Sequence, residues 1–117
     1  MEPERQQVAC GLQVGHVPGA PGLQVAVIGE LDVVSAAAFV ERVTQLCDDC
    51  DRLGEGAVVV DLTQCRFLDA SGLAALVRLD ARARQGGSVL RLRGASPFHR
   101  RLLRLTDLHA LLDPLPR

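Results

Sequence analysis

Apolar and polar residues alternate at the start of the chain. Within residues 7–15, every second residue from Val8 to Val14 is apolar, which is the period of a half-buried strand. Turn-forming residues follow at 17–22, and residues 23–29 read as a second strand. The two segments are therefore predicted to form a β-hairpin.

A helical period replaces this alternation after residue 35. Apolar residues recur at spacings of three and four from Phe39 to Cys50, which predicts an amphipathic helix over about 36–50. Ser35 directly precedes the helix. Its hydroxyl is predicted to act as the N-cap by accepting a backbone N–H of the first turn.

Residues 57–62 (AVVVDL) form a continuous run rich in β-branched residues, typical of a strand covered on both faces. A second helix is predicted to follow and to end at the glycine pair 86–87, since glycine suits a helix C-terminus. Asp69 and Ser71 are equally good candidates for its N-cap, because each carries a side-chain oxygen. Gly72 either lets a partner backbone approach closely or relieves crowding beside the strand end.

The last third of the chain predicts one more strand and one more helix. Residues 88–93 alternate, and Ser96 followed by Pro97 is a favoured helix start. The segment 108–116 is predicted either to add a short strand or to pack at an edge. The apolar stripe of the third helix is predicted to consist of Phe98, Leu102 and Leu105.

The resulting element order is β-β-α-β-α-β-α. It predicts an α/β fold with a mixed, largely parallel sheet of four to five strands and helices packed on it. A chain of 117 residues with 48% hydrophobic residues suffices for one core and is too short for two. We therefore expect a single domain over residues 1–117, with its core at about 7–113.

Charge is divided unevenly along the chain. Residues 1–65 carry three arginines and ten acidic residues, a net charge of −7, whereas residues 66–117 carry ten arginines and four acidic residues, a net charge of +6. The halves should attract each other or present different faces to a partner. Neither helical arginine cluster, 78–84 or 100–104, contains an aromatic residue, so solvated helix faces are expected and direct nucleic-acid binding is not.

Neither a membrane span nor a signal sequence is recognisable. No apolar run approaches the roughly 20 residues needed to cross a bilayer, and the start lacks a basic segment followed by an apolar one. A cytoplasmic protein without direct membrane contact is therefore predicted.

Reactive groups do not converge in the sequence. His16, His99 and His109 are isolated from one another, and the glycine-rich motifs of nucleotide sites are missing. Cys47 and Cys50 have a redox or zinc spacing, but acidic neighbours and a helix C-terminus disfavour the thiolate, and no second ligand pair follows. The chain is therefore predicted to be a binding module, not an enzyme, with no metal or cofactor.

Three segments resemble one family. Residues 29–39 (GELDVVSAAAF), 58–76 (VVVDLTQCRFLDASGLAAL) and 101–112 (RLLRLTDLHALL) are similar, in the right order, to the STAS domain of anti-sigma factor antagonists. The resemblance implies the STAS fold. It also implies binding to an anti-sigma factor that is a serine kinase with a histidine-kinase-like fold, which frees a sigma factor for transcription. Phosphorylation by that kinase ends the binding in the family, and a phosphatase resets the cycle.

The family's switch motif reads Asp, Ser or Thr, Ser or Thr, Gly, and its first hydroxyl residue carries the phosphate. This chain has Ala70 at that position, so the usual acceptor is absent. Ser71 fills the second position, and it is interpreted either as a substitute acceptor or as a helix cap. The residues implied in partner binding are Asp32, Ser35, Asp69, Ala70, Ser71, Gly72 and Leu73.

A different function also fits the sequence. Some stand-alone STAS proteins are accessory subunits that brace the ATPase of an ABC lipid transporter. Such a role needs no phosphorylation, which agrees with Ala70.

Overall fold

The computed structural model describes residues 4–17, 22–51 and 57–112, and for residues 50 and 51 it describes the backbone alone. The predicted turns at 18–21 and 52–56 and the tail at 113–116 lie outside the described residues. The elements are β1 (Glu4–Ala9), β2 (Leu12–His16), β3 (Leu23–Leu31), α1 (Ala36–Asp51), β4 (Ala57–Asp61), β5 (Cys65–Leu68), α2 (Ala70–Gln85), β6 (Val89–Arg93), α3 (Pro97–Leu103) and the 3₁₀ helix η1 (Asp107–Leu111).

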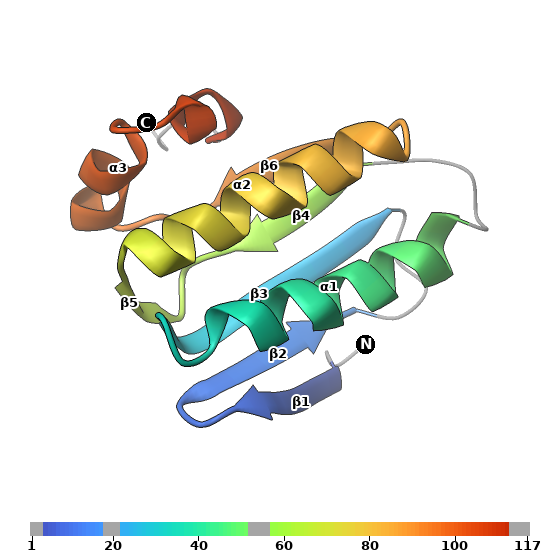
Figure 1. Cartoon of the computed structure of the whole chain (residues 1–117), viewed down its shortest axis with the longest axis horizontal. Helices are drawn as coiled ribbons and strands as arrows, with labels where there is room; N and C mark the ends of the chain where they lie inside the picture. The colour runs from blue at the N-terminus through green and yellow to red at the C-terminus, as the bar shows by residue number, and fades with distance from the viewer. Residues whose placement is uncertain (1–3, 18–21, 52–56, 113–117) are drawn as a thin grey trace.

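One mixed sheet organises these elements. The order is β1-β2-β3-β4-β6, with β5 paired to β3. The pairs β1–β2 and β2–β3 are antiparallel, whereas β3–β4, β3–β5 and β4–β6 are parallel. Figure 1 shows α1 and α2 side by side across one face of the sheet, with α3 beyond the end of β6. The predicted α/β class with a mixed, largely parallel sheet is confirmed.

Two details of the prediction are wrong. Residues 7–15 are not one strand, because the chain reverses at residues 10 and 11 and Ala9 pairs with Leu12. Gly11 permits this tight turn with a φ of 79°. The second error is a missed strand, β5. Together with the division of residues 7–15 into β1 and β2, it gives the described sheet six strands in place of the predicted four to five.

β4 and β5 occupy successive stretches of the same edge of β3. β4 pairs with the first part of β3, up to Ala26, and β5 pairs with the last part, where Leu68 lies opposite Leu31. Between them the chain bends at residues 62–64, where the N–H of Cys65 donates to the carbonyl of Leu62 over 3.0 Å. The chain thereby reaches the end of β3 before α2 begins.

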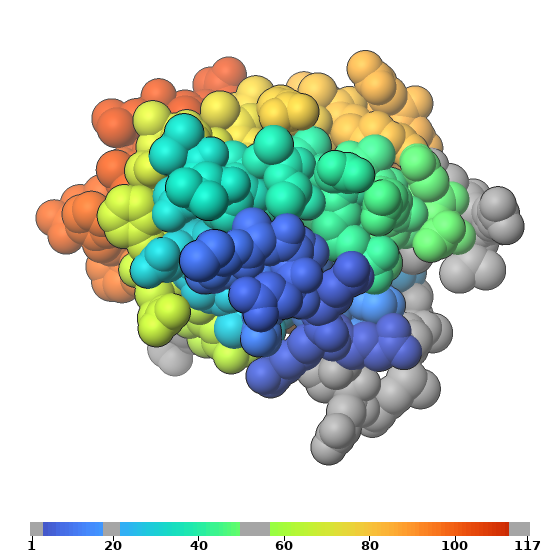
Figure 2. Space-filling model, turned by 60° about the horizontal axis from the view of Figure 1, so that its bottom comes forward, coloured from blue at the N-terminus to red at the C-terminus, as the bar shows by residue number. Residues whose placement is uncertain are grey.

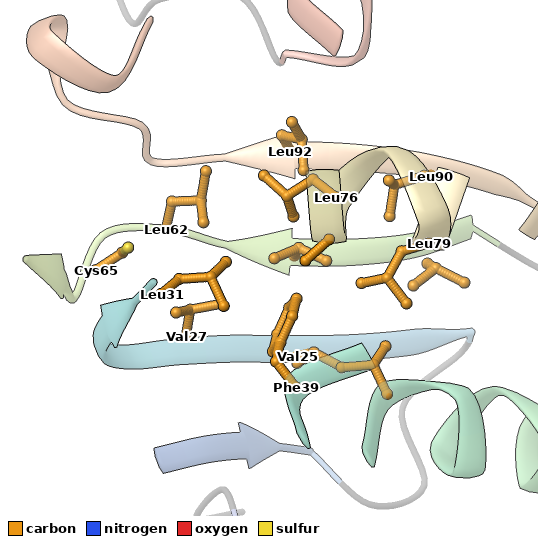
Figure 3. Close-up of a cluster of buried hydrophobic side chains, with 14 of the residues drawn as sticks. Val25, Val27, Leu31, Phe39, Leu62, Cys65, Leu76, Leu79, Leu90 and Leu92 are labelled. Atoms are coloured by element: carbon orange, nitrogen blue, oxygen red, sulfur yellow. The ribbon is translucent and has the colours of Figure 1, made fainter. Parts of the chain in front are cut away.

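The core lies between the sheet and the two long helices. Alternate residues of β3 are buried on the face beneath α1 and α2. Burial of each large aliphatic side chain stabilises the fold by about 1.5–3 kcal/mol, so the two helices are firmly attached. Side chains in this cluster, shown in Figure 3, include Val25, Val27, Leu31, Phe39, Leu62, Leu76, Leu79, Leu90 and Leu92.

Two ion pairs join the acidic and basic halves of the chain. Arg82 on α2 pairs with Asp48 on α1, and Arg93 on β6 lies 3.5 Å from Asp61 on β4. The predicted attraction between the halves therefore has a structural counterpart. Cys47 is buried on α1, whereas the side chain of Cys50 lies outside the description.

The third helix differs from its prediction. Ser96 caps it as expected, since its hydroxyl oxygen accepts the N–H of His99 over 3.1 Å, and Pro97 begins it. Of the predicted stripe, Leu102 is partly buried against the core, but Phe98 is 59% and Leu105 78% exposed. Instead, His99 and Leu103 are the buried residues. A helix this short has two apolar sides, and the spacing alone could not tell which one is buried.

The C-terminal segment packs at the edge of the sheet. Its residues form η1, and Leu112 then makes an isolated parallel bridge with Leu92 of β6. This agrees with edge packing, one of the two alternatives expected for residues 108–116. Among the described residues, no helix is long and apolar enough to cross a membrane.

Candidate functional site

Two of the three segments that carry the resemblance, 29–39 and 58–76, meet at one edge of the sheet. β3 leads into α1 and β5 leads into α2, and the last residues of these strands, Leu31 and Leu68, are partners in the parallel ladder. Figure 1 accordingly shows the starts of α1 and α2 at the same end of the sheet. The loop at 32–35 and the turn at 69–72 are therefore neighbours, as the resemblance implied.

Four hydrogen bonds fix the loop before α1. The Asp32 carboxylate accepts the N–H groups of Val34 and Ser35 over 3.0 and 3.1 Å. The Ser35 hydroxyl donates to the carbonyl of Glu30 over 2.8 Å and accepts the N–H of Asp32 over 3.0 Å. The prediction that the Ser35 hydroxyl caps the first turn of the helix is therefore wrong. It ties the loop back to β3 instead, because its fully buried side chain points toward the strand end.

Gly29, the glycine of the GELD segment at residues 29–32, has a separate structural role. Gly29 has a φ of 117°, and a Cβ on it would lie 2.1 Å from the carbonyl oxygen of Gly11. That carbonyl accepts the N–H of Glu30 over 2.9 Å. Any side chain at residue 29 would break this close approach of β2 to β3, so glycine is required there.

Asp69 is the N-cap of α2. Its backbone is extended and its carboxylate accepts the N–H of Gly72 over 3.1 Å. Ser71 lies one residue inside the helix, and its hydroxyl has no hydrogen-bond partner among the described residues. The choice left open by the sequence is thus decided for Asp69, and the interpretation of Ser71 as the cap is wrong.

Gly72 lets the start of α2 lie against the end of β3. A Cβ at this position would lie 2.5 Å from the carbonyl oxygen of Leu31 and 2.5 Å from a methyl group of Leu68. Of the two interpretations offered by the sequence, relief of crowding at the strand end is therefore the one with a structural basis. The contact sets the distance between the loop at 32–35 and α2.

Cys65, at the start of β5, is buried behind this edge. Burial raises the pKa of its thiol, and the thiol donates to the carbonyl of Phe67 over 3.3 Å. The raised pKa keeps the sulfur protonated and poorly nucleophilic. Among the described residues, no three His, Cys, Asp or Glu side chains form a group that could hold a metal ion.

The site exposes apolar side chains, which we call the apolar edge surface. Val33 and Val34 are 75% and 67% exposed, and Phe67 and Val77 are about half exposed. In Figure 2 the atoms at the start of α1, in teal, adjoin those around the start of α2, in yellow. The apolar edge surface consists of Val33, Val34, Phe67, Ala70, Ala74 and Val77.

The seven residues predicted to bind a partner fall into two groups. Ala70 is exposed and Asp32, Asp69 and Ser71 are partly exposed, whereas Ser35, Gly72 and Leu73 are buried. The buried three shape the site and do not contact solvent. Sequence reasoning predicted docking through the loop at 32–35 without singling out Val33 and Val34, and it missed Phe67. The available signal was a pair of valines in a connecting loop, where no strand or helix period requires them.

Comparison with known proteins identifies the family. The family model described as "Mlab, STAS domain" matches residues 16–113. The chain belongs to the STAS domain family. A search of curated proteins found no match.

Solved structures agree with this family and its fold. The anti-sigma factor antagonist SpoIIAA, from Bacillus, has in its unphosphorylated form a TM-score of 0.66 at 15% identity, covering 91% of this chain and 89% of that one. RsbS from Moorella thermoacetica, in a serine-to-glutamate variant, gives 0.68 at 21% identity, covering 89% and 87%. The murine anion transporter Slc26a9 gives 0.63 at 15% identity, covering 81% of this chain and 16% of that one. The predicted STAS fold is confirmed.

Proposed function

We propose that this STAS domain is an anti-sigma factor antagonist, which docks on an anti-sigma factor and thereby regulates sigma-factor-dependent transcription. The apolar edge surface carries the proposal. Exposed apolar side chains gathered at one edge of a domain are typical of a protein-binding site, and here they lie in the segments that resemble the antagonists. The fold shared with SpoIIAA, named as such an antagonist, supports the proposal.

The edge is well suited to docking because its base is rigid. Asp32 and Ser35 hold the loop that presents Val33 and Val34, and both ends of the loop join buried structure. A loop already ordered in the free protein loses little conformational entropy on binding. The apolar side chains would supply the contact area, while Asp32 and Asp69 at its rim would favour one orientation of the partner.

The proposed partner is an anti-sigma factor with a histidine-kinase-like serine kinase fold, with a phosphatase as the opposing enzyme. Ala70 stands exposed at the first position of α2, where the family carries its phosphate. Without a hydroxyl there, the protein would remain an unphosphorylated antagonist, and regulation would lie in its abundance or in its partner. Ser71 is the remaining candidate acceptor, and a phosphate there would add about −1.5 to −2 charges beside Asp69 and weaken docking.

A capture experiment tests the docking site. Tagged protein is incubated with lysate of the source organism, and bound proteins are identified by mass spectrometry. Val34→Glu places a charge in the apolar edge surface. Val89→Glu is the matched control, because Val89 is 52% exposed and is the first residue of β6, at the end of that strand farther from the apolar edge surface. We expect capture of an anti-sigma factor by wild type and Val89→Glu but not by Val34→Glu. Equal capture by all three would refute the proposed surface.

The phosphorylation hypothesis needs its own experiment. The captured kinase is mixed with ATP and with wild type, Ala70→Ser or Ser71→Ala. We expect phosphate uptake by Ala70→Ser, because this variant restores the family's acceptor at the same helix position. Uptake by wild type that Ser71→Ala abolishes would identify Ser71 as the acceptor. No uptake by Ala70→Ser with an active kinase would contradict the assignment of this position.

Ala70 also favours a second candidate function, the accessory subunit that braces the ATPase of an ABC lipid transporter. That role requires a stable docking surface and no phosphate acceptor. The same capture experiment distinguishes the two, because an ABC ATPase in place of an anti-sigma factor would select the accessory role.

A further inference from the structure

The outer side of α3 is apolar, and among the described residues the ring of its Phe98 lies 6.0 Å, between centroids, from the ring of the neighbouring His99. Phe98 and Leu105 lie seven residues apart, with Arg101 between them, so all three project from one side of the helix and the turn that continues it. Phe98 is 59% and Leu105 78% exposed, and Arg101 and Arg104 are exposed as well. We call these four residues, Phe98, Arg101, Arg104 and Leu105, the α3 face.

The side of α3 opposite the α3 face packs against the domain. His99 and Leu103 are buried on the inner side of α3, and Leu108 of η1 is buried next to it. The helix is therefore fixed to the domain by one apolar side while a second apolar side remains in solvent. Core packing cannot explain Phe98 and Leu105.

The charged residues of α3 and its C-cap are all basic. They are Arg100, Arg101 and Arg104, and the nearest acidic residue in the sequence, Asp107, begins η1. A second copy of this chain is a poor occupant, since a symmetric contact would bring Arg101 and Arg104 of both copies together, with Asp107 as the one acidic residue beside them in the sequence. The occupant must carry negative charge and accept apolar side chains.

The position of α3 in the molecule further limits the kind of partner that the α3 face can bind. Figure 1 shows α3 at a corner of the molecule, beyond the end of β6, and Figure 2 shows the same orange segment projecting at the margin of the surface. Two apolar side chains on a projecting corner can insert into the headgroup layer of a lipid membrane. Flanking arginines can contact the phosphates of that layer.

We propose that the α3 face is a peripheral contact for an anionic membrane surface, with Phe98 and Leu105 inserted at the headgroup level and Arg101 and Arg104 on the lipid phosphates. The sequence predicted no direct membrane contact because it offers no spanning segment. A peripheral contact needs none. The proposal does not depend on the anti-sigma factor hypothesis, since it uses a different surface.

Vesicle flotation tests the proposal. The full chain is mixed with phosphatidylcholine vesicles, with or without about one third phosphatidylglycerol, which supplies negative surface charge. We expect flotation with the anionic vesicles only. Raising the salt from about 0.1 M to about 1 M shortens the Debye length from about 10 Å to about 3 Å and should abolish flotation.

Two double variants locate the contact. Phe98→Ala with Leu105→Ala, and Arg101→Gln with Arg104→Gln, should each reduce the floated fraction several-fold. Val89→Ala with Arg91→Gln is the matched control, because both residues are exposed on β6 and belong to neither surface, and it should float like wild type. No flotation of wild type, or equal flotation of all variants, would refute the proposal. Loss of a captured protein partner from the α3 variants without any vesicle binding would assign the face to a protein instead.

Discussion

Two exposed apolar regions of this domain, the apolar edge surface and the α3 face, are attached to the fold in different ways. Val33 and Val34 stand on a loop that hydrogen bonds between Asp32, Val34 and Ser35 hold together and that the Ser35 hydroxyl attaches to Glu30 of β3. Phe98 and Leu105 stand on a short helix attached mainly through His99 and Leu103. The rims of the two regions also differ, with Asp32 and Asp69 beside the first and Arg101 and Arg104 beside the second.

This difference predicts how the two regions respond to mutation. Residues that shape the apolar edge surface are also part of the fold, so changes there should cost stability as well as binding. Changes on the α3 face should cost binding alone. Measurements of unfolding free energy can therefore test whether the two regions differ in this way.

The largest loss is expected for Gly72→Ala. The new Cβ would overlap the carbonyl oxygen of Leu31 and a methyl of Leu68, both at 2.5 Å, and we expect a loss of about 2–3 kcal/mol despite alanine's better helix propensity. Urea unfolding measures it. The neighbouring Ser71→Ala is the control and should stay within about 0.5 kcal/mol of wild type. A Gly72→Ala protein as stable as wild type would show that the two strand–helix units are free to shift apart.

Ser35→Ala should come next. The substitution leaves the carbonyl of Glu30 and the N–H of Asp32 without their hydroxyl partner at a buried position, which costs about 1–3 kcal/mol. The unfolding midpoint in urea reports the loss, and Ser88→Ala serves as the control because its hydroxyl makes no hydrogen bond with described residues. Equal midpoints for both variants would mean that the loop is held by Asp32 alone.

The cap of α2 should be worth less. Asp69→Ala removes the oxygen that accepts the N–H of Gly72, with an expected loss of about 1 kcal/mol, whereas Asp69→Asn retains a capping oxygen and should recover most of it. Thermal unfolding of the two variants compares them directly. The capping assignment fails if Ala and Asn lower the melting temperature equally.

A pH-dependent effect of similar size is expected under α3. Burial lowers the pKa of His99, so the unfolded chain binds a proton more readily than the folded one. This stability is complete above the unfolded pKa of about 6.5 and falls toward lower pH by up to about 1.4 kcal/mol per pH unit, until the lowered folded pKa is reached. We expect His99→Gln to flatten the curve between pH 7 and 5. Parallel curves for the variant and wild type would refute a role for His99.

The smallest effect should come from the α3 face itself. Phe98→Ala with Leu105→Ala removes side chains that are mostly in solvent, so the free energy of unfolding should change by less than about 0.5 kcal/mol. Leu103→Ala, on the buried side of α3, is the matched control and should lose at least about 2 kcal/mol. A large loss in the double variant would mean that these two side chains pack against the domain.

The sequence predicted the long elements well because their periods are clear. The apolar spacing that indicated a helix over 36–50 corresponds to α1, and the β-branched run at 57–62 contains β4. The turn between β1 and β2 escaped prediction since the alternation continues through it, and only Gly11 marks the reversal. β5 escaped because four residues are too few to show a period.

The site was predictable in its location but not in its chemistry. The resemblance pointed to the loop at 32–35 and the turn at 69–72, which the structure brings together. It could not separate Asp69 from Ser71 as the cap, because both carry a suitable oxygen and only backbone geometry decides. Nor could it indicate that Ser35 is buried while Val33 and Val34 are exposed, since that depends on the bonds of Asp32.

The pairing of β4 and β5 with one edge of β3 also implies an order of folding. β1, β2 and β3 pair with their neighbours in sequence, whereas β4 and β5 reach β3 only after the whole of α1 has been made. Contacts between distant segments form late in folding, because closing a long loop costs more entropy. We therefore expect the apolar edge surface to form only after α1 and the start of α2 have been made, although β6 joins β4 later still. A partner that recognises this surface would ignore nascent chains that end before α2.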